Sequence, residues 1–378
     1  MPIAVSTYER LAGDMLALYE EAETKMLGRV ASRLAKGVTT AGWTERKYAE
    51  TSAVRKELSG VVDGLSKNRR KLADEFINAA YSGSSQAFVN EAQQFASWAG
   101  ISHLSPNSAK VAAILSELNS TMDAADRLIL RKANDAYADI VGHASALVAT
   151  GTTTVREAVK DELKDFADKG ITSFVDKAGR CWEMSTYAEM ATLTAIERAT
   201  LEGYTDTMQS YGFDLAVISS HVGACPLCVA WEGVIVSVSG KTSGYPSLAD
   251  AEGSGVFHPR CLHHISTYYE GISRNTRSAP RKVQEPSSAY SARSKQRQYE
   301  CAIRRWKRRM AVATTPEEER KAYAYVRKYQ ASIRKLRNDY NSSTPYSTDW
   351  LPRKYWREGG RVKLSSAAKK LPAVKLPK

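Results

Sequence analysis

The sequence predicts an α+β protein with a mainly helical N-terminal region, a small α+β central domain and a basic helical hairpin near the C-terminus. Three observations predict this order: helical periodicity over the first 150 residues, two short β-branched runs between residues 214 and 240, and a concentration of lysine and arginine beyond residue 270. At 378 residues with 43% hydrophobic residues, the chain is long enough to bury the core of more than one domain.

Residues 1–150 form the predicted helical region. A long amphipathic helix is expected from Thr7 to about Ala35, because apolar residues recur there at spacings of three and four. These residues are Leu11, Met15, Leu18, Leu27, Val30 and Leu34. Similar periodicity continues through residues 54–65 and 69–81, breaks at SGSSQ (82–86) and resumes over 111–148. We expect the apolar stripes to pack into a core.

Residues 151–270 form the predicted central α+β domain. A further helix is expected over residues 152–170, and then the pattern changes. Two short β-branched runs, DLAVIS (214–219) and GVIVSVSG (233–240), are typical of strands. In the second run Val234, Val236 and Val238 alternate with Ile235, Ser237 and Ser239, which is the two-residue period of a β-strand.

Residues 271–340 predict a Ser/Arg/Pro linker followed by two antiparallel helices. Thr315 is the expected N-cap of the second helix and Pro316 its first residue. One apolar seam consists of Tyr299, Ile303, Trp306 and Met310, and the other of Val326, Tyr329, Ile333, Leu336 and Tyr340. Residues 341–378 lack sustained apolar periodicity, and we expect them to form a flexible basic tail.

The positive charge of the chain lies at its C-terminus. Residues 1–270 hold 26 Lys and Arg against 33 Asp and Glu, a net charge of −7, whereas residues 271–378 hold 28 against 8, a net charge of +20. This asymmetry predicts a polyanionic partner for the last quarter, either nucleic acid or an acidic protein surface. The candidate nucleic-acid-binding residues are expected to face outward from the hairpin seam; they are Arg304, Arg305, Lys307, Arg308 and Arg309.

Two stretches gather three of the five cysteines and four of the six histidines: HVGACPLCVAWEG (221–233) and VFHPRCLHH (256–264). Zinc favours four thiolate and imidazole ligands in a tetrahedral arrangement, and a gap of two residues lets both side chains of a pair reach one ion. The predicted zinc ligands are therefore Cys225, Cys228, His258 and Cys261. His263 is the second choice as the imidazole ligand, with His264 and His221 as further competitors.

The same motifs speak against catalysis. A catalytic zinc needs an open coordination position and a general base, but H-E-x-x-H is absent and Gly223 stands where a nucleobase deaminase has its glutamate. Glu232 is expected to be a solvated turn residue. We therefore predict a structural zinc, no catalytic residues and no enzyme activity. No apolar run is long enough to cross a bilayer, which predicts a protein made in the cytoplasm without a membrane partner.

Three further stretches are specific enough to compare with known proteins. They are residues 170–199 (GITSFVDKAGRCWEMSTYAEMATLTAIERA), 212–240 (GFDLAVISSHVGACPLCVAWEGVIVSVSG) and 257–271 (FHPRCLHHISTYYEG), followed by the basic segment RQYECAIRRWKRRM. This order resembles the phage minor capsid protein 2 family, related to the Mu F-type head morphogenesis proteins of tailed bacteriophages. In that resemblance the zinc ligands match Cys225, Cys228, His258 and Cys261. Other motif positions match Trp231, Gly233, Gly179, Arg180 and Trp182.

The resemblance implies a minor structural protein of the virion, located in the capsid interior near the portal. Its implied partners are the portal protein, the major capsid protein and packaged double-stranded DNA. Two alternatives remain open: a phage-delivered enzyme such as an ADP-ribosyltransferase-like effector, and a zinc-dependent nucleic-acid-binding protein. The second alternative expects base-reading residues on a helix beside the zinc, but most of the positive charge lies 30 or more residues from that motif.

Overall fold

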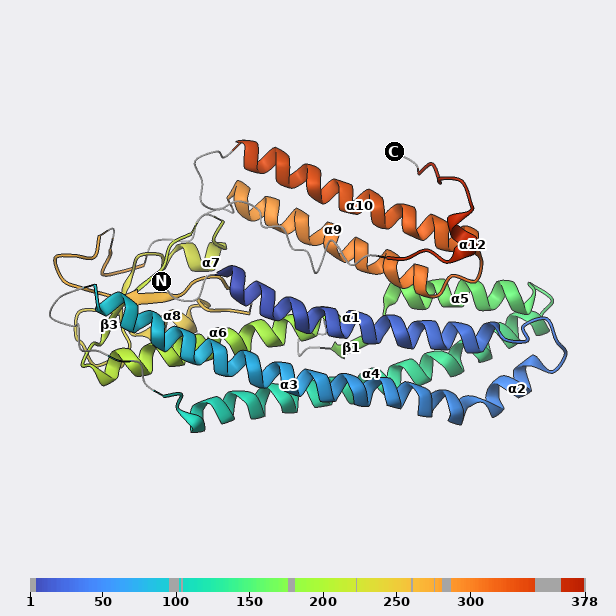
Figure 1. Cartoon of the computed structure of the whole chain (residues 1–378), viewed down its shortest axis with the longest axis horizontal. Coiled ribbons are helices and arrows are strands. Elements are labelled where there is room, and N and C mark those ends of the chain that lie inside the picture. The colour runs from blue at the N-terminus through green and yellow to red at the C-terminus, as the bar shows by residue number, and fades with distance from the viewer. Residues whose placement is uncertain are drawn as a thin grey trace.

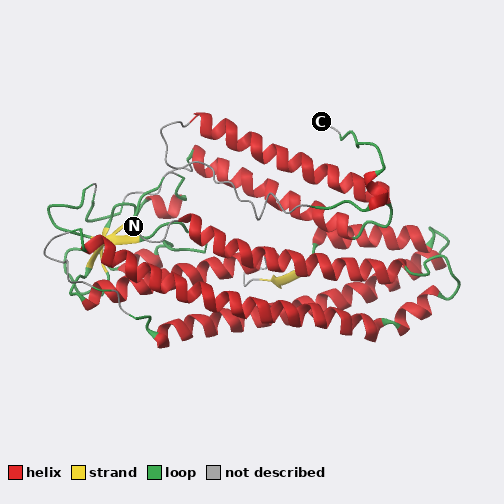
Figure 2. Ribbon diagram, in the orientation of Figure 1, coloured by secondary structure: helices red, strands yellow, loops and turns green. Residues whose placement is uncertain are grey.

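The computed structural model describes residues 5–94, 102, 105–175, 181–221, 223–259, 261–274, 276–280, 287–343 and 362–376. These residues are mostly helical, and the long helices run roughly along the longest axis of the molecule (Figure 1, Figure 2). A small sheet of three antiparallel strands lies at one end. The prediction of a mainly helical chain with a small β component is confirmed. No described helix is both long and apolar enough to cross a membrane.

Four long helices form a bundle. They are α1 (Val5–Ala35), α3 (Thr51–Ala92), α4 (Ser108–Ala149) and α6 (Met184–Ser210), and α6 packs against the other three. In α1 the predicted apolar stripe faces the core, since Met15, Leu27, Val30 and Leu34 have no exposed surface. The side chain of Leu11, which belongs to the same stripe, lies outside the described residues.

Two shorter helices complete this part of the molecule. α2 (Trp43–Ala49) connects α1 to α3, and α5 (Val155–Lys169) follows α4. The start of α5 is fixed by a capping box, in which the Thr154 hydroxyl accepts from the Glu157 N–H and the Glu157 carboxylate accepts from the Thr154 N–H. The predicted helix at residues 152–170 is therefore confirmed to within a few residues.

The predicted break at residues 82–86 is wrong, because α3 continues through it to Ala92. Ser84 and Ser85 are fully buried where α3 meets α6. The backbones approach so closely that a Cβ added to Gly203 of α6 would lie 2.3 Å from the Tyr81 carbonyl oxygen. Small residues therefore allow two helices to cross here, and they do not interrupt either helix.

The sheet has the strand order β4-β3-β5, all antiparallel, with β3 (Leu215–Ile218) between β4 (Ile235–Ser237) and β5 (Ile265–Thr267). Its first two strands confirm the two predicted β-branched runs. Two short helices, α7 (Pro226–Val229) and α8 (Leu248–Gly253), lie in its connections. A separate hairpin of β1 (Thr172–Val175) and β2 (Cys181–Glu183) precedes α6. Gly179 and Arg180 of the quoted motif lie outside the described residues.

The C-terminal hairpin consists of α9 (Ser288–Ala311) and α10 (Pro316–Ser343), which lie side by side along the bundle (Figure 1). Its own small core is formed by Ile303, Val326 and Ile333, all fully buried. The predicted start of α10 is confirmed, because the Thr315 hydroxyl accepts from the Glu318 N–H at 3.3 Å. The two predicted helices are thus present and pack through the predicted seams.

The prediction of a flexible tail does not hold for residues 362–376. This segment contains α12 (Ser366–Lys369) and packs on α10. Ala368 is fully buried, and the Ser365 N–H donates to the Glu319 carboxylate at 2.6 Å. A few apolar and capping contacts suffice to dock a short segment whose composition alone indicates a tail.

The core of the bundle crosses the predicted boundary at residue 150. One continuous set of buried side chains includes Ile129 and Val141 before the boundary and Leu163, Ala188 and Ile196 after it. A second core lies around the sheet and takes in Phe88 of α3 with Tyr204 and Met208 of α6. Both long helices therefore contribute to two cores.

Candidate functional site

The sheet brings the two cysteine and histidine loops together. β3 and β5 are antiparallel, and Ile218 at the end of β3 pairs with Ile265 at the start of β5. The loop that leaves β3 and the loop that enters β5 must therefore meet at the same edge of the sheet. The first loop carries Cys225 and Cys228, and the second carries His258, Cys261 and His263.

The first loop positions its sulfurs through a short helical turn. The Cys225 sulfur is the N-cap of α7 and accepts from the Cys228 N–H at 3.4 Å, and Pro226 occupies the first helical position. Gly223 before the pair and Gly233 after it have positive φ angles of 84° and 74°, which favour glycine. Cys228 is fully buried, whereas Cys225 is half-buried.

The second loop contains a tight turn and one residue with a strained backbone conformation. The Cys261 N–H donates to the His258 carbonyl at 2.8 Å, which closes the H-P-R-C turn. Phe257 has a φ angle of 56° and is the one non-glycine residue with positive φ in the described part of the chain. Such strain persists where the surrounding structure enforces it, often beside functional groups, and here it immediately precedes His258.

Five donor atoms gather at this edge. The Cys225 sulfur lies 3.1 Å from the His258 Nε2 atom, the Cys228 sulfur 3.6 Å from the Cys261 sulfur, and the Cys261 sulfur 3.3 Å from the His263 Nδ1 atom. These atoms form two triads that share Cys228, and within each triad all donor atoms lie within 4.8 Å of one another. Zinc ligands about 2.3 Å from one ion lie roughly 3.8 Å apart in a tetrahedron, so the spacing within each triad is close to what zinc needs, while the four predicted ligands are divided between the two triads.

All four predicted ligands lie in these triads, and the choice of imidazole remains between His258 and His263. His258 belongs to the triad with Cys225 and Cys228, and His263 to the triad with Cys228 and Cys261. The other competitors belong to neither triad. The His221 ring lies against the His263 ring at a tilt of 42° with centroids 4.3 Å apart, and the His264 N–H donates to the Ser219 hydroxyl.

Hydrogen bonds orient both imidazoles for ligation. The His258 Nδ1 atom donates to the Pro259 carbonyl at 3.0 Å, which leaves Nε2 directed at Cys225. The His263 Nε2 atom donates to the Glu232 carboxylate at 3.2 Å, which leaves Nδ1 directed at Cys261. A histidine that binds metal usually donates its other N–H to a carboxylate or carbonyl in this way. Either histidine is therefore prepared to hold an ion.

Glu232 is not the solvated turn residue that the sequence suggested. It also accepts from the His221 N–H at 2.8 Å, and its side chain is 15% exposed. Burial alone would raise the pKa of Glu232, but the hydrogen bonds from His263 and His221 lower it. The only sequence signal for this role was its place in a W-E-G turn four residues after Cys228.

The sulfurs compete for protons in a crowded site. The hydrogen bond from Cys228 lowers the pKa of the Cys261 thiol, and the same contact, together with burial, raises the pKa of Cys228. Burial acts to lower the pKa of His263, but the hydrogen bonds to Cys261 and Glu232 outweigh it and raise that pKa to about 9. A metal ion would replace the thiol protons, so its binding would depend on pH.

A cavity of about 420 Å³ adjoins the cluster. The cysteine and histidine loops form one wall, and α6, the first half of α9 and Ala12 of α1 line the rest. Glu197 of α6 lines this cavity, and burial followed by the charge of Cys261 raises its pKa to about 10. The cavity places the cluster next to both the bundle and the hairpin.

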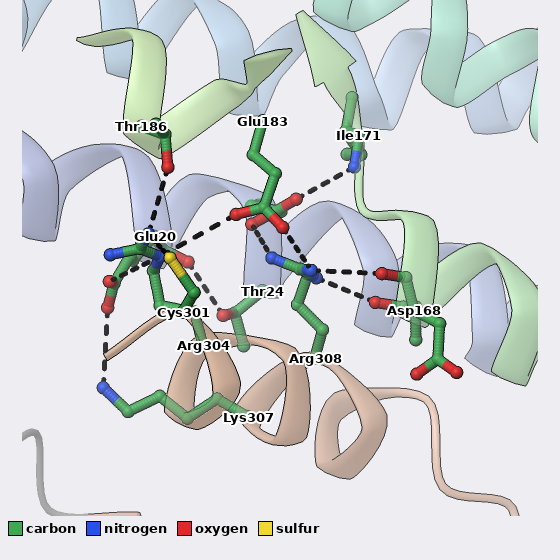
Figure 3. Close-up of polar contacts among 12 residues, drawn as sticks. Glu20, Thr24, Asp168, Ile171, Glu183, Thr186, Cys301, Arg304, Lys307 and Arg308 are labelled. Carbon is green, nitrogen blue, oxygen red and sulfur yellow. Dashed lines mark hydrogen bonds and ion pairs between the residues drawn. The ribbon is translucent and has the colours of Figure 1, made fainter. Parts of the chain in front are cut away.

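The five predicted nucleic-acid-binding residues do not all face outward, and this part of the prediction is wrong. Arg305 is exposed, but the side chains of Arg304 and Arg308 are 3% and 2% exposed. Lys307 pairs with Glu20 of α1 at 3.5 Å, and Arg309 pairs with Asp168 at the end of α5. Figure 3 shows the contacts of Arg304, Lys307 and Arg308, in which α9 meets α1, the end of α5 and the start of α6.

The physical reason is the four-residue spacing of Arg304 and Arg308. Residues at i and i+4 lie on one face of a helix, and this face is distinct from the Ile303 and Trp306 seam that contacts α10. The Arg304 guanidinium donates to the Thr186 hydroxyl at 3.0 Å, and the Arg308 guanidinium donates to the Glu183 carboxylate at 3.0 Å. The acidic partners on α1 and β2 carried no sequence signal, because their pairing depends on the tertiary fold.

Comparison with known proteins gives a consistent class. The chain is 30% identical over 238 residues to a structural protein of Lactococcus phage LL-H, covering 59% of this chain and 61% of that protein. It is also 30% identical over 120 residues to a structural protein of Lactococcus phage mv4, covering 30% of this chain and 90% of that protein. The chain thus spans about 61% of the length of the first relative. No solved structure matches.

These relatives define a class, the structural proteins of bacteriophages. The match to a family is wider: residues 4–338 match the phage minor capsid protein 2 family, so this chain belongs to that family. The resemblance seen in the sequence is confirmed, and the family is one of phage capsid proteins. The matches give no support to the alternatives of an ADP-ribosyltransferase-like effector or a free zinc-dependent nucleic-acid-binding protein.

Proposed function

We propose that this protein is a minor structural component of the phage head, located inside the capsid near the portal, and that its C-terminal hairpin contacts packaged DNA. Family membership supports the place in the virion. The net charge of +20 over residues 271–378 supports a polyanionic partner. The portal and the major capsid protein are the proposed protein partners, as the resemblance implied.

One observation carries the DNA contact, namely the surface that the hairpin leaves exposed. Although Arg304 and Arg308 are buried, many other lysine and arginine side chains of the hairpin and of its docked segment face solvent. We call this set the outer basic face: Lys295, Arg305, Lys321, Arg327, Arg334, Lys335, Lys363, Lys369, Lys370 and Lys375. Exposed acids among the described residues of the two helices are few, Glu317 and Asp339. Exposed lysine and arginine side chains can neutralise phosphates without reading base sequence.

The cysteine and histidine cluster is proposed to hold one structural zinc ion. Cys225, Cys228 and Cys261 would supply thiolates, and His258 would supply the imidazole, with His263 as the alternative. A bound zinc would join the loop after β3 to the loop before β5 and so stabilise an edge of a sheet of only three short strands. The proposed role is structural because every side chain of the set is a ligand or orients one.

Salt dependence of DNA binding tests the DNA contact. We expect the full chain to bind duplex DNA without sequence preference, with an affinity that falls steeply between low and physiological salt as counterions are released. The variant Arg305→Ala/Lys321→Ala/Arg327→Ala/Arg334→Ala should reduce the slope of log affinity against log salt by roughly 0.9 for each phosphate that the protein no longer neutralises.

A matched control removes the same charge from the bundle. Arg55, Lys56, Lys67 and Lys71 are exposed on α3, far along the chain from the hairpin, and their replacement by Ala should leave the slope nearly unchanged. Equal slopes for the two variants would show that net charge alone matters. If the full chain binds no DNA at low salt but captures the portal protein, the partner of the outer basic face is a protein.

A further inference from the structure

The hairpin is attached to the rest of the molecule mainly through charged side chains. We define the arginine face of α9 as Arg304, Lys307, Arg308 and Arg309, and the acidic patch as Glu20, Glu23, Asp168 and Glu183. Figure 3 labels all of these residues except Arg309 and Glu23. The acidic patch draws on α1, the end of α5 and β2, which all belong to the bundle side. Each member of one set pairs with at least one member of the other.

Arg308 lies at the centre of this contact. Its guanidinium donates to the Glu183 carboxylate at 3.0 Å and to the Ala167 carbonyl at 2.8 Å, and it lies 3.6 Å from the Glu23 carboxylate. Ala167 is in the last turn of α5, where unpaired carbonyl groups and the helix dipole attract a cation. Arg308 therefore binds here much as it would bind a phosphate, through charge and several directed N–H groups.

The charged contact is incompletely satisfied. Among the described residues, four buried atoms of this contact have no hydrogen-bond partner: Glu20 Oε1, Glu183 Oε2, Arg304 Nε and Arg308 Nη1. The ion pairs of Arg304 are long, at 3.8 Å to Glu183 and 4.0 Å to Glu20. Buried charges that lack full hydrogen bonding recover little of their desolvation cost. A partner that offers better hydrogen bonds to these cations can therefore compete.

The hairpin can remain folded when it leaves the bundle. Ile303, Val326 and Ile333 form its own core, and the Trp306 ring stacks on Tyr325 with centroids 3.9 Å apart. Its apolar attachment to the bundle is limited, with Val312 buried in the bundle core and Ala311 packed against it. Arg277 pairs with Val234 beside the sheet, and ten residues of sequence separate it from Ser288, the first residue of α9.

From these observations we propose that the arginine face of α9 is an interaction surface with two competing occupants, the acidic patch of the bundle and the phosphates of duplex DNA. The inference rests on the proposed DNA contact and adds that DNA displaces the hairpin from the bundle. In the docked state Arg304 and Arg308 are buried, so only the outer basic face is available to DNA. Displacement adds the arginine face to the DNA contact and exposes the acidic patch.

Weakening the acidic patch provides the first test, in the full chain. Glu20→Gln/Glu23→Gln/Glu183→Gln keeps the side-chain shape but removes the charges that hold the arginine face. Since apparent affinity scales with the fraction of the binding-competent state, we expect the Kd for duplex DNA to fall about tenfold or more. The control Glu21→Gln/Glu75→Gln/Glu117→Gln removes the same charge from side chains that are 63%, 55% and 68% exposed, and should change the Kd far less.

A cross-link provides the second test, and it does not depend on weakening any ion pair. The Arg304 guanidinium bridges the Thr186 hydroxyl at 3.0 Å and the Cys301 sulfur at 3.1 Å, so these two positions are close across the interface. Thr186→Cys joined to native Cys301 by a short thiol cross-linker fixes the hairpin on the bundle. We expect the cross-linked protein to bind DNA about tenfold or more weakly than the same variant without cross-linker.

The outcomes separate this inference from the function on which it rests. A higher affinity for the glutamine triple variant and a lower affinity for the cross-linked protein support competition. Equal DNA affinity with and without the cross-link overturns it, and DNA then sits on the outer basic face of the docked hairpin. If no variant binds DNA at low salt, the DNA contact itself is wrong and the competition with it. Circular dichroism of each variant confirms that its helices are intact.

Discussion

The bundle and the C-terminal hairpin are both built from long helices, but different forces attach them to the molecule. In the bundle, α1, α3, α4 and α6 share a continuous apolar core. The hairpin keeps a small core to itself and meets the bundle through buried and half-buried ion pairs. Apolar burial does not depend on salt in the way that charge pairs do, so the first attachment is expected to be permanent and the second conditional.

The largest effect is expected from loss of Cys228, the proposed metal ligand that belongs to both triads. Cys228→Ser should abolish zinc binding and unfold the sheet at the end of the bundle, because structural zinc contributes on the order of 10 kcal/mol in small domains. Zinc content and hydrogen exchange of β3 and β5 measure this. Cys301→Ser, a cysteine outside the cluster, should keep about one zinc per chain. Wild-type protein without zinc and unaffected by chelators would contradict the proposed site.

The difference between the bundle and the hairpin is tested by shortening one buried side chain in each core. Ile129 of α4 and Ile333 of α10 are both fully buried. Ile129→Ala should lower the free energy of unfolding of the whole bundle by about 2–5 kcal/mol, because it leaves a cavity in the shared core. Ile333→Ala should loosen the hairpin and leave the unfolding of the bundle nearly unchanged. Denaturant unfolding followed by hydrogen exchange distinguishes them, and an equal loss in both regions would mean a single cooperative unit.

A smaller effect is expected at the carboxylate that orients His263. Glu232→Gln removes the charged acceptor of the His263 Nε2 proton, and loss of a group that orients a metal ligand typically weakens metal binding about 10–100-fold. Competition with a chromophoric chelator measures the affinity. Glu252, which lies in the nearby helix α8, offers a control for the loss of one carboxylate, and Glu252→Gln should leave zinc affinity unchanged. Unchanged affinity in Glu232→Gln would point to His258 as the sole imidazole ligand.

The smallest expected effect is a pH dependence of hairpin docking. Glu318 of α10 pairs with Lys160 and Lys164 of α5 at 2.9 and 3.2 Å. Burial acts to raise the pKa of Glu318, but hydrogen bonds from Lys160 and the Thr314 N–H lower it to about 2. The stabilisation is therefore present above the usual pKa of 4.5 and is lost as the pH falls from about 4.5 toward 2.

Glu318→Gln tests this origin of the acid sensitivity. In the wild type, protection of α9 and α10 from hydrogen exchange should decline over that pH interval before protection of the bundle does. The variant should show weaker protection at neutral pH and a flatter decline. A decline that is the same in both proteins would assign the acid sensitivity to the acidic patch instead of Glu318.

Much of the fold could be predicted from local pattern, and the failures share a cause. The apolar stripe of α1, the caps of α5 and α10, and the β-branched runs of β3 and β4 are local signals that tertiary packing did not alter. The prediction of a break at residues 82–86 failed because the small residues Ser84 and Ser85 allow α3 to cross another helix closely and do not end α3. The periodicity did not single out α6 as a helix, because buried residues occur around most of its circumference.

In the candidate site, too, local signals could be predicted from the sequence and tertiary contacts could not. The spacing of Cys225, Cys228, His258 and Cys261 is a property of the chain, and the structure places each of the four in one of the two triads or in both. The role of Glu232 depends on how the loop after β3 lies against the loop before β5, which spacing does not encode. Likewise, charge counting located a basic segment correctly but gave no indication that Arg304 and Arg308 face the bundle.

The course of α6 through two cores has a consequence for how the molecule unfolds. Its first half, with Ala188 and Ile196, lies in the bundle core, and its second half, with Tyr204 and Met208, lies in the core around the sheet. A continuous helix shared in this way couples the bundle core to the core around the sheet. Unfolding of either core must then disrupt part of α6, so a thermal scan of the intact chain should show both cores unfolding together.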